Sequence, residues 1–125
     1  MSCLSECAVA VIDDDERVLE SLENLLESAG HTVRLFTSAE AFLKDEAFAK
    51  VDCVISDIGM PAIDGFELER RARAARPELP VILITGRQEL IKGPRATHRV
   101  GTEILLKPVG EQELLRAISK ALTSR

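Results

Sequence analysis

The feature that most constrains the fold of this chain is a regular alternation between short apolar runs and longer amphipathic segments. The apolar runs lie at residues 8–12, 31–36, 52–56, 80–85 and 103–106, and each has the length of a β-strand. After each run, apolar residues recur at the spacing of a helix. Nearly continuous apolar strands that alternate with helices are typical of a parallel sheet covered on both faces. The pattern therefore predicts an α/β fold.

The size of the chain suits a small version of this architecture. Its 125 residues are enough for one domain, and 46% of them are apolar, so a core can form without disulfides or a structural metal. With right-handed crossovers, five strands in this length favour the flavodoxin-like (βα)5 fold, a doubly wound sheet of order 2-1-3-4-5. We predict that residues 8–123 form this domain and that residues 1–7 form an N-terminal arm.

Cap and breaker residues give the expected limits of the helices. Ser38 is placed to cap a helix over residues 39–48, and Asp64 is placed to cap the helix after the third strand. The fourth helix is the least regular, because Gly93 and Pro94 fall near its middle. Proline in a helix interior removes an amide donor and costs about 3 kcal/mol. We therefore predict that helix 4 is short or irregular.

Composition narrows the cellular setting and the class of partner. A net charge of −5 argues against direct binding of nucleic acid. The sequence has no signal-peptide pattern and no apolar run long enough to span a membrane. Its three cysteines cannot all pair within one chain, which fits a reducing compartment. We expect a cytoplasmic protein that itself contacts neither membranes nor nucleic acid.

Polar residues occupy the ends of the predicted strands. The first strand is followed by Asp13 and Asp14, the third by Asp57 and the fifth by Lys107, while the fourth ends at Thr85. The carboxyl ends of parallel strands meet at one edge of a sheet, which is where such folds place their functional groups. We therefore predict that these side chains lie close together.

Three carboxylates at one edge indicate a metal ion. Carboxylates a few ångströms apart raise each other's pKa, and all of them stay ionised only beside a cation. Oxygen ligands with room for water suit Mg²⁺. We therefore predict Mg²⁺ bound by Asp13, Asp14 and Asp57. The next acidic residue, Asp15, is expected to cap the first helix, where its charge meets the helix dipole.

A metal ion beside a free carboxylate, a lysine and a hydroxyl favours phosphoryl transfer. In that reaction positioning and charge neutralisation supply most of the catalysis. Asp57, alone at the end of its strand, is the predicted nucleophile and would become an acyl phosphate. Lys107 would balance charge on the phosphoryl oxygens, and Thr85 would form a hydrogen bond to the phosphoryl group once it has arrived.

These residues stand in motifs of a known family. The segments "VIDDDE", "SDIGMPAIDG", "VILITG" and "LLKP" occur in one order, and the second contains the pattern D-x-x-M-P-x-x-D-G, formed by Asp57, Met60, Pro61, Asp64 and Gly65. With this pattern and the Lys-Pro pair, the chain resembles the receiver domain of two-component response regulators over nearly its whole length. Its sequence looks most like those of receiver domains that precede a helix-turn-helix output domain.

The resemblance implies a signalling function. Asp57 would accept a phosphoryl group from a histidine kinase or a histidine phosphotransfer protein, and the domain would catalyse its own phosphorylation and dephosphorylation there. The backbone carbonyl of Gly59 would join Asp13, Asp14 and Asp57 as a ligand of Mg²⁺. The phosphorylated domain would act on a downstream protein or a fused output domain, with homodimer formation on activation as one option.

One position departs from the family pattern. In the family, an aromatic residue on the fifth strand follows the hydroxyl of the Thr85 position inward, but this chain has Ile104 there. The departure keeps a second interpretation open, a receiver-like module that binds partners independently of phosphorylation. A third, a Mg²⁺-dependent phosphohydrolase, is less favoured because Gly59 stands where such enzymes usually carry an acid. The resemblance also implies a cis peptide bond between Lys107 and Pro108.

Overall fold

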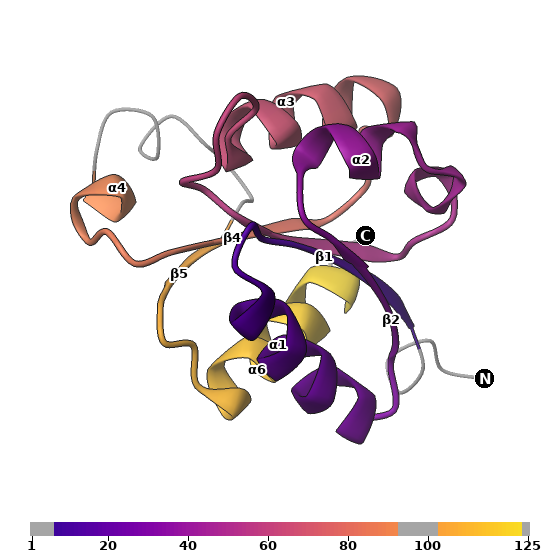
Figure 1. Ribbon diagram of the computed structural model, residues 1–125. Coiled ribbons are helices and arrows are strands. Elements are labelled where there is room, and N and C mark those ends of the chain that lie inside the picture. The colour runs from indigo at the N-terminus through magenta and orange to yellow at the C-terminus, as the bar shows by residue number, and fades with distance from the viewer. Residues whose placement is uncertain (1–6, 93–102, 124–125) are drawn as a thin grey trace.

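A computed structural model describes residues 7–92 and 103–123 of the chain, and its centre is one five-stranded parallel sheet (Figure 1). The strands are β1 (Ala8–Ile12), β2 (Thr32–Phe36), β3 (Cys53–Asp57), β4 (Val81–Thr85) and β5 (Glu103–Leu106). They lie in the order β2-β1-β3-β4-β5, and every neighbouring pair is parallel. The predicted flavodoxin-like topology is confirmed.

Helices cover both faces of the sheet (Figure 1). One face carries α1 (Glu16–Ser28) and α6 (Glu111–Thr123). The other carries α2 (Ala39–Lys44), the 3-10 helix η2 (Glu46–Ala49) and α3 (Gly65–Ala75). The described part of α4 (Glu89–Lys92) lies beside the β4–β5 edge, and the predicted irregularity at Gly93-Pro94 falls outside the described residues.

The two faces of the sheet form two apolar clusters. Along β3, Cys53 and Ile55 pack on the α1–α6 side while Val54 packs on the α2–α3 side. All five residues of β3 and of β4 are buried. Because successive side chains in a strand point to opposite faces, a strand covered on both sides is apolar along most of its length. This explains the continuous apolar runs in the sequence.

The helix predicted over residues 39–48 is interrupted, so this prediction is wrong at Asp45. The backbone of Asp45 is extended, with φ −87° and ψ 148°, and this residue ends α2 and precedes η2. The Asp45 carboxylate accepts a hydrogen bond from the Ala47 N–H at 2.8 Å. Aspartate side chains compete in this way with the helical hydrogen bonds of the backbone, and a new helical turn then begins.

The predicted caps of α2 and α3 are present. The Ser38 hydroxyl accepts a hydrogen bond from the Ala41 N–H at 3.1 Å and begins α2. The Asp64 carboxylate accepts one from the Glu67 N–H at 2.9 Å and begins α3. Each cap satisfies a backbone donor that has no partner within its helix. These capping residues in the connections after the strands therefore fix where the helices start.

Candidate metal-binding and phosphoacceptor site

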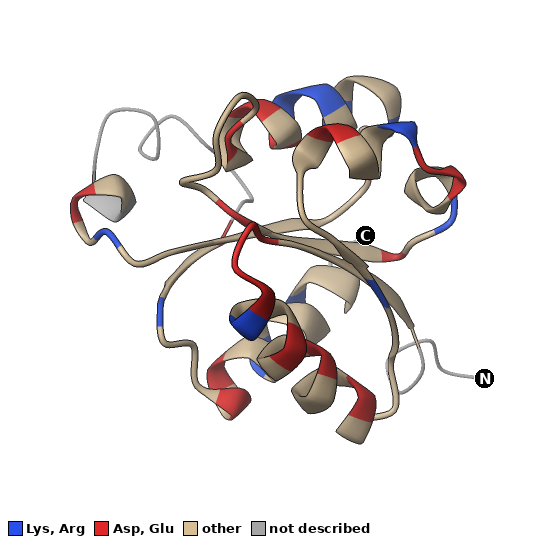
Figure 2. Cartoon of the chain, in the orientation of Figure 1, with Lys and Arg blue, Asp and Glu red and all other residues tan. Residues whose placement is uncertain are grey.

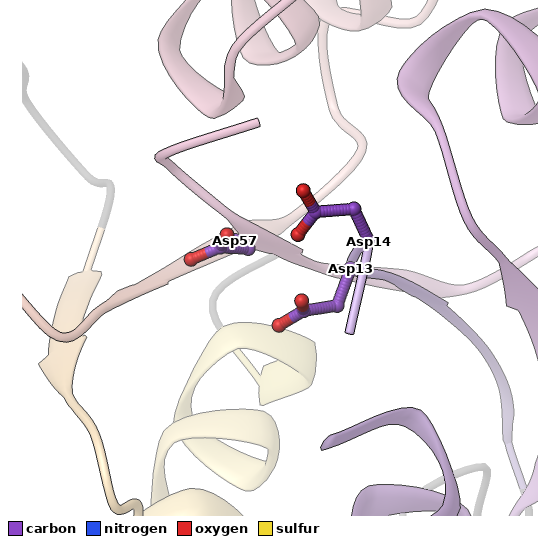
Figure 3. Close-up of side chains that lie close together, drawn as sticks. All are labelled: Asp13, Asp14 and Asp57. Carbon is purple, nitrogen blue, oxygen red and sulfur yellow. The ribbon is translucent and has the colours of Figure 1, made fainter. Parts of the chain in front are cut away.

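Three carboxylates meet at the carboxyl edge of the sheet (Figure 3). Asp13 and Asp14 follow β1, and Asp57 is the last residue of β3, the strand beside it. One oxygen from each carboxylate lies within 4.8 Å of the others. Among residues 7–92 and 103–123, no other group of acidic, histidine or cysteine side chains is arranged to share a metal ion. The predicted convergence of these three residues is therefore observed.

Asp13 is the most enclosed of the three. Its exposed fraction is 0%, whereas Asp14 is exposed. Burial raises the pKa of Asp13, and the negative charge of Asp57 raises it further, although hydrogen bonds from Lys107 and from the Asp15 backbone lower it in part. Ionising a buried carboxylate costs free energy, and a positive charge beside it offsets this cost.

Lys107 supplies one such charge. Its Nζ donates a hydrogen bond to Asp13 Oδ2 at 2.8 Å and lies 3.2 Å from Asp57 Oδ1. Burial alone would lower the pKa of Lys107, but the hydrogen bond to Asp13 and the charges of Asp57 and Asp13 outweigh it and raise the pKa. Lys107 is therefore held as a cation between the two buried acids. The bond from Lys107 to Pro108 is cis, as the resemblance implied.

Asp57 is held against the start of α3. Its exposed fraction is 7%. A Cβ on Gly65 would lie 2.7 Å from the Asp57 carbonyl oxygen and 2.8 Å from the Cα of Ile58, closer than real Cβ atoms come. The Gly65 N–H also donates a hydrogen bond to the Ile58 carbonyl at 3.0 Å. The family motif therefore needs glycine at this position for close packing, a reason that the sequence alone did not reveal.

Thr85 and Gly59 lie on the strand and loop expected for them. Thr85 is the last residue of β4, is 2% exposed, and accepts a hydrogen bond at its Oγ1 from the Arg87 N–H at 3.0 Å. Its carbonyl accepts the Lys107 N–H at 2.7 Å. Gly59 is exposed, and a Cβ added there would meet no atom within 4 Å. The catalytic role of Thr85 and the metal-ligand role of Gly59 stay predictions.

Asp15 contributes a contact that the sequence did not predict. Its side chain caps α1 as expected, by accepting a hydrogen bond from the Arg17 N–H at 2.9 Å. Its own N–H, however, donates to Asp13 Oδ1 at 2.9 Å. The run of three aspartates therefore places two carboxylates in the cluster and a backbone donor behind one of them. The only sign of this contact in the sequence was the predicted role of Asp15 as the cap of the first helix.

Acidic residues continue from the cluster onto α1 (Figure 2). That helix carries Glu16, Glu20, Glu23 and Glu27. A surface of one sign raises the local concentration of oppositely charged ions. The donor atoms at the cluster are carboxylate oxygens, which suit Mg²⁺ rather than a soft metal. The residues present therefore fit a hard divalent cation held beside the buried Asp57 carboxylate.

The sequence profile of the family described as "Response regulator receiver domain" matches residues 9–119. The chain belongs to this family, whose members act in phosphorylation-dependent signal transduction. Members of the family also occur within transcription regulators such as FixJ. The resemblance drawn from the motifs is confirmed.

Particular relatives agree with this assignment. The chain is 34% identical over 117 residues to the response regulator protein TmoT of Ectopseudomonas mendocina, covering 94% of this chain and 53% of TmoT. It is 36% identical over 114 residues to the transcriptional regulatory protein FixJ of Bradyrhizobium diazoefficiens, covering 91% of this chain and 56% of FixJ. The chain thus spans about half the length of the curated relatives it matches.

Solved structures give the same result. The beryllofluoride-activated DrrB receiver domain superposes with a TM-score of 0.80 at 28% sequence identity, over 94% of this chain and 98% of that one.

Within the described residues, no helix is both long enough and apolar enough to cross a membrane.

Proposed function

We propose that this receiver domain accepts a phosphoryl group onto Asp57 from a phosphohistidine, in a reaction that depends on Mg²⁺. The observation that carries the proposal is the position of Asp57, which lies in a cluster with Asp13 and Asp14 and has the Lys107 ammonium 3.2 Å from one of its oxygens. A buried carboxylate that has an ammonium group beside it and shares a metal site with two other carboxylates is suited to act as a nucleophile toward phosphorus.

In the proposed transfer, a carboxylate oxygen of Asp57 forms the new bond to phosphorus. The phosphorus–nitrogen bond of the donor breaks, and the imidazole keeps the electron pair and takes up a proton. Lys107 stays close to Asp57 and balances negative charge on the phosphoryl oxygens. It is already held as a cation by Asp13 and Asp57, so little reorganisation is needed when the phosphoryl group arrives.

Thr85 is suited to recognise the phosphoryl group after transfer. Its oxygen accepts the Arg87 N–H, which uses a lone pair and leaves the hydroxyl proton available. A phosphoryl oxygen on Asp57 would be an acceptor for that proton. Because Thr85 lies at the end of β4 and its carbonyl accepts the Lys107 N–H, movement at Thr85 would reach the segment that follows β5.

Asp13, Asp14, Asp57 and the carbonyl of Gly59 would hold Mg²⁺. When bound, the ion would neutralise charge on the phosphoryl group and on the carboxylates around it. Water positioned by the same residues would later hydrolyse the acyl phosphate, so that the domain would also catalyse its own dephosphorylation. These ligand assignments belong to the proposal.

The partners belong to the proposal as well. The donor would be a histidine kinase or a histidine phosphotransfer protein, and the recipient of the signal would be a downstream protein or an output domain. FixJ and TmoT, which are about twice as long as the matched segment, support the second option. A homodimer on activation and a cytoplasmic location are also part of this hypothesis.

Ile104 favours one alternative, a module that binds partners without phosphorylation. It stands at the position where the family has an aromatic residue, and it is half-buried against the α2–α3 side of the core together with Leu90. An aliphatic side chain fills this space but has no ring that can move between two positions. The alternative predicts the same partner binding for the phosphorylated and unphosphorylated forms.

Intact-mass measurement after incubation with Mg²⁺ and acetyl phosphate tests the proposal. The wild-type chain should gain one phosphoryl group, and Asp57→Asn should gain none. Asp45→Asn is a matched control, because it also removes one carboxylate while asparagine keeps the cap of η2. It should be phosphorylated like the wild type. An unmodified wild-type chain, or equal modification of Asp57→Asn, would rule the proposal out.

A further inference from the structure

We infer that Asp15 is a positioning residue for the metal site, because its helix cap fixes the backbone N–H that orients Asp13. The inference rests on the proposed function, in which Asp13 is a ligand of Mg²⁺. It goes further by giving the third aspartate of the run a role in metal binding that does not require contact with the ion.

The cap holds Asp15 in place at the start of α1. The backbone of Asp15 is extended, with φ −100° and ψ 111°, and its carboxylate accepts the Arg17 N–H at 2.9 Å. Its carbonyl accepts the N–H groups of Val18 at 3.1 Å and Leu19 at 3.2 Å. These contacts from the first turn of α1 hold the side chain of Asp15 and the peptide group that follows it. With both of these fixed, the residue that carries the N–H has little freedom to rotate.

The N–H of Asp15 in turn contacts the carboxylate of Asp13. Its Oδ1 accepts the Asp15 N–H at 2.9 Å, and its Oδ2 accepts Lys107 Nζ at 2.8 Å. Both oxygens of this fully buried carboxylate therefore have a fixed donor, one from the start of α1 and one from the segment after β5. Hydrogen bonds to metal ligands set ligand orientation, and their loss commonly weakens metal binding about 10- to 100-fold.

The charge of Asp15 has a role separate from its contact with Asp13. The carboxylate of Asp15 is directed to the helix and to the Arg17 guanidinium, whose Nε lies 3.4 Å from Oδ1. It is not a member of the three-carboxylate group. The hydrogen bond that joins Asp15 to Asp13 comes from the backbone N–H, so the structure assigns the effect on the metal site to geometry rather than to a fourth negative charge.

Two neutral variants distinguish whether the helix cap or the charge of Asp15 affects Mg²⁺ binding. Asp15→Ser removes the charge but keeps an oxygen that can cap α1, whereas Asp15→Ala removes both. Mg²⁺ affinity is measured by calorimetry, and hydrogen exchange of the residue 15 amide is measured by NMR in the absence of Mg²⁺. We expect Asp15→Ala to bind Mg²⁺ about fivefold more weakly than Asp15→Ser, the factor that corresponds to a cap worth about 1 kcal/mol. Exchange of the residue 15 amide should be faster in Asp15→Ala alone.

Asp45→Ala is the matched control for loss of a capping aspartate. Asp45 also caps a helix through the N–H two residues later, at 2.8 Å, and also pairs with an arginine, Arg34, at 3.3 Å. It is not part of the acidic cluster. Asp45→Ala should therefore bind Mg²⁺ like the wild type even if it unfolds more easily.

Three results would overturn the inference. They are equal Mg²⁺ affinity in Asp15→Ala and Asp15→Ser, an equal loss in Asp45→Ala, and an Asp15→Ala amide that exchanges as slowly as in the wild type. Failure of the wild-type chain to bind Mg²⁺ is a separate outcome, since it would remove the proposed metal site itself. The two failures are therefore distinguishable.

Discussion

The two sides of the functional edge are built in different ways. On the β1–β3 side, Asp13 is fully buried with a hydrogen-bond donor on each oxygen, and α1 and α3 begin at aspartate caps a few residues beyond the strands. On the β5 side, Leu106 is 38% exposed and Ile104 is only half-buried. The first side is ordered by directional polar contacts, and the second by aliphatic packing.

Lys107 joins the two sides. It follows β5 in the sequence, but its ammonium contacts Asp13 and Asp57. Phosphoryl acceptance should therefore depend on the β5 side mainly through this one side chain. We therefore expect substitutions on the β5 side to leave the chemistry of the acidic cluster largely unchanged as long as Lys107 is kept, and the following predictions test this.

The largest effect is expected at the junction of β3 and α3. Gly65→Ala would place a Cβ 2.7 Å from the Asp57 carbonyl oxygen, and both neighbours there are backbone atoms that cannot move aside easily. We expect the free energy of unfolding, measured with denaturant, to fall by about 3 kcal/mol. Phosphorylation should fall as well, because the displaced backbone carries Asp57, the proposed nucleophile.

Gly59→Ala is the control in the same loop. A Cβ at Gly59 meets no atom within 4 Å, so the unfolding free energy should change by less than about 0.5 kcal/mol. Equal effects of the two substitutions would show that the β1–β3 side is not held as tightly as its contacts indicate.

Most of the fold could be predicted from the sequence because its causes are local. Buried parallel strands require continuous apolar runs, and the caps at Ser38 and Asp64 mark helix starts by chemistry that a few neighbouring residues contain. The convergence of Asp13, Asp14, Asp57 and Lys107 followed from the topology alone, since strand ends share an edge.

The remaining features depend on distances that no local pattern encodes. Asp45 has a helical neighbourhood in the sequence, and only its capping contact with Ala47 shows that the helix ends there. The need for glycine at Gly65 arises from its approach to the backbone of β3. The Asp15 contact with Asp13 depends on the direction of a peptide N–H, which a sequence motif does not specify.

An intermediate effect is expected on the β5 side. Ile104→Ala removes a half-buried side chain that packs against the core, and we expect the unfolding free energy to fall by about 1–2 kcal/mol. Phosphorylation by acetyl phosphate should keep its wild-type rate within about twofold, because Ile104 packs among apolar side chains on the α2–α3 side of the sheet. Ile104→Val should leave both quantities close to wild type. A tenfold slower phosphorylation of Ile104→Ala would show that the two sides of the edge are coupled beyond Lys107.

The smallest effect is expected from Asp13→Asn in metal-free buffer. Burial raises the pKa of Asp13 above its ordinary value of 3.8, so the folded chain binds this proton more tightly than the unfolded chain does. The stability that Asp13 contributes is therefore greatest at low pH and falls as the pH rises through the folded pKa. Asparagine does not titrate and avoids this loss. At pH 7 the variant should melt about 3 °C above the wild type, and the difference should shrink as the pH is lowered toward about 4.

The matched variant for this measurement is Asp14→Asn, which removes an exposed carboxylate of the same cluster and should shift Tm by less than about 1 °C. A lower Tm for Asp13→Asn at pH 7 would mean that the ion pair with Lys107 outweighs the burial of the charge. The expected rise in Tm would instead show that the buried Asp13 carboxylate destabilises the metal-free fold on the β1–β3 side. A cation-binding site requires such a carboxylate, whereas the aliphatic packing on the β5 side does not.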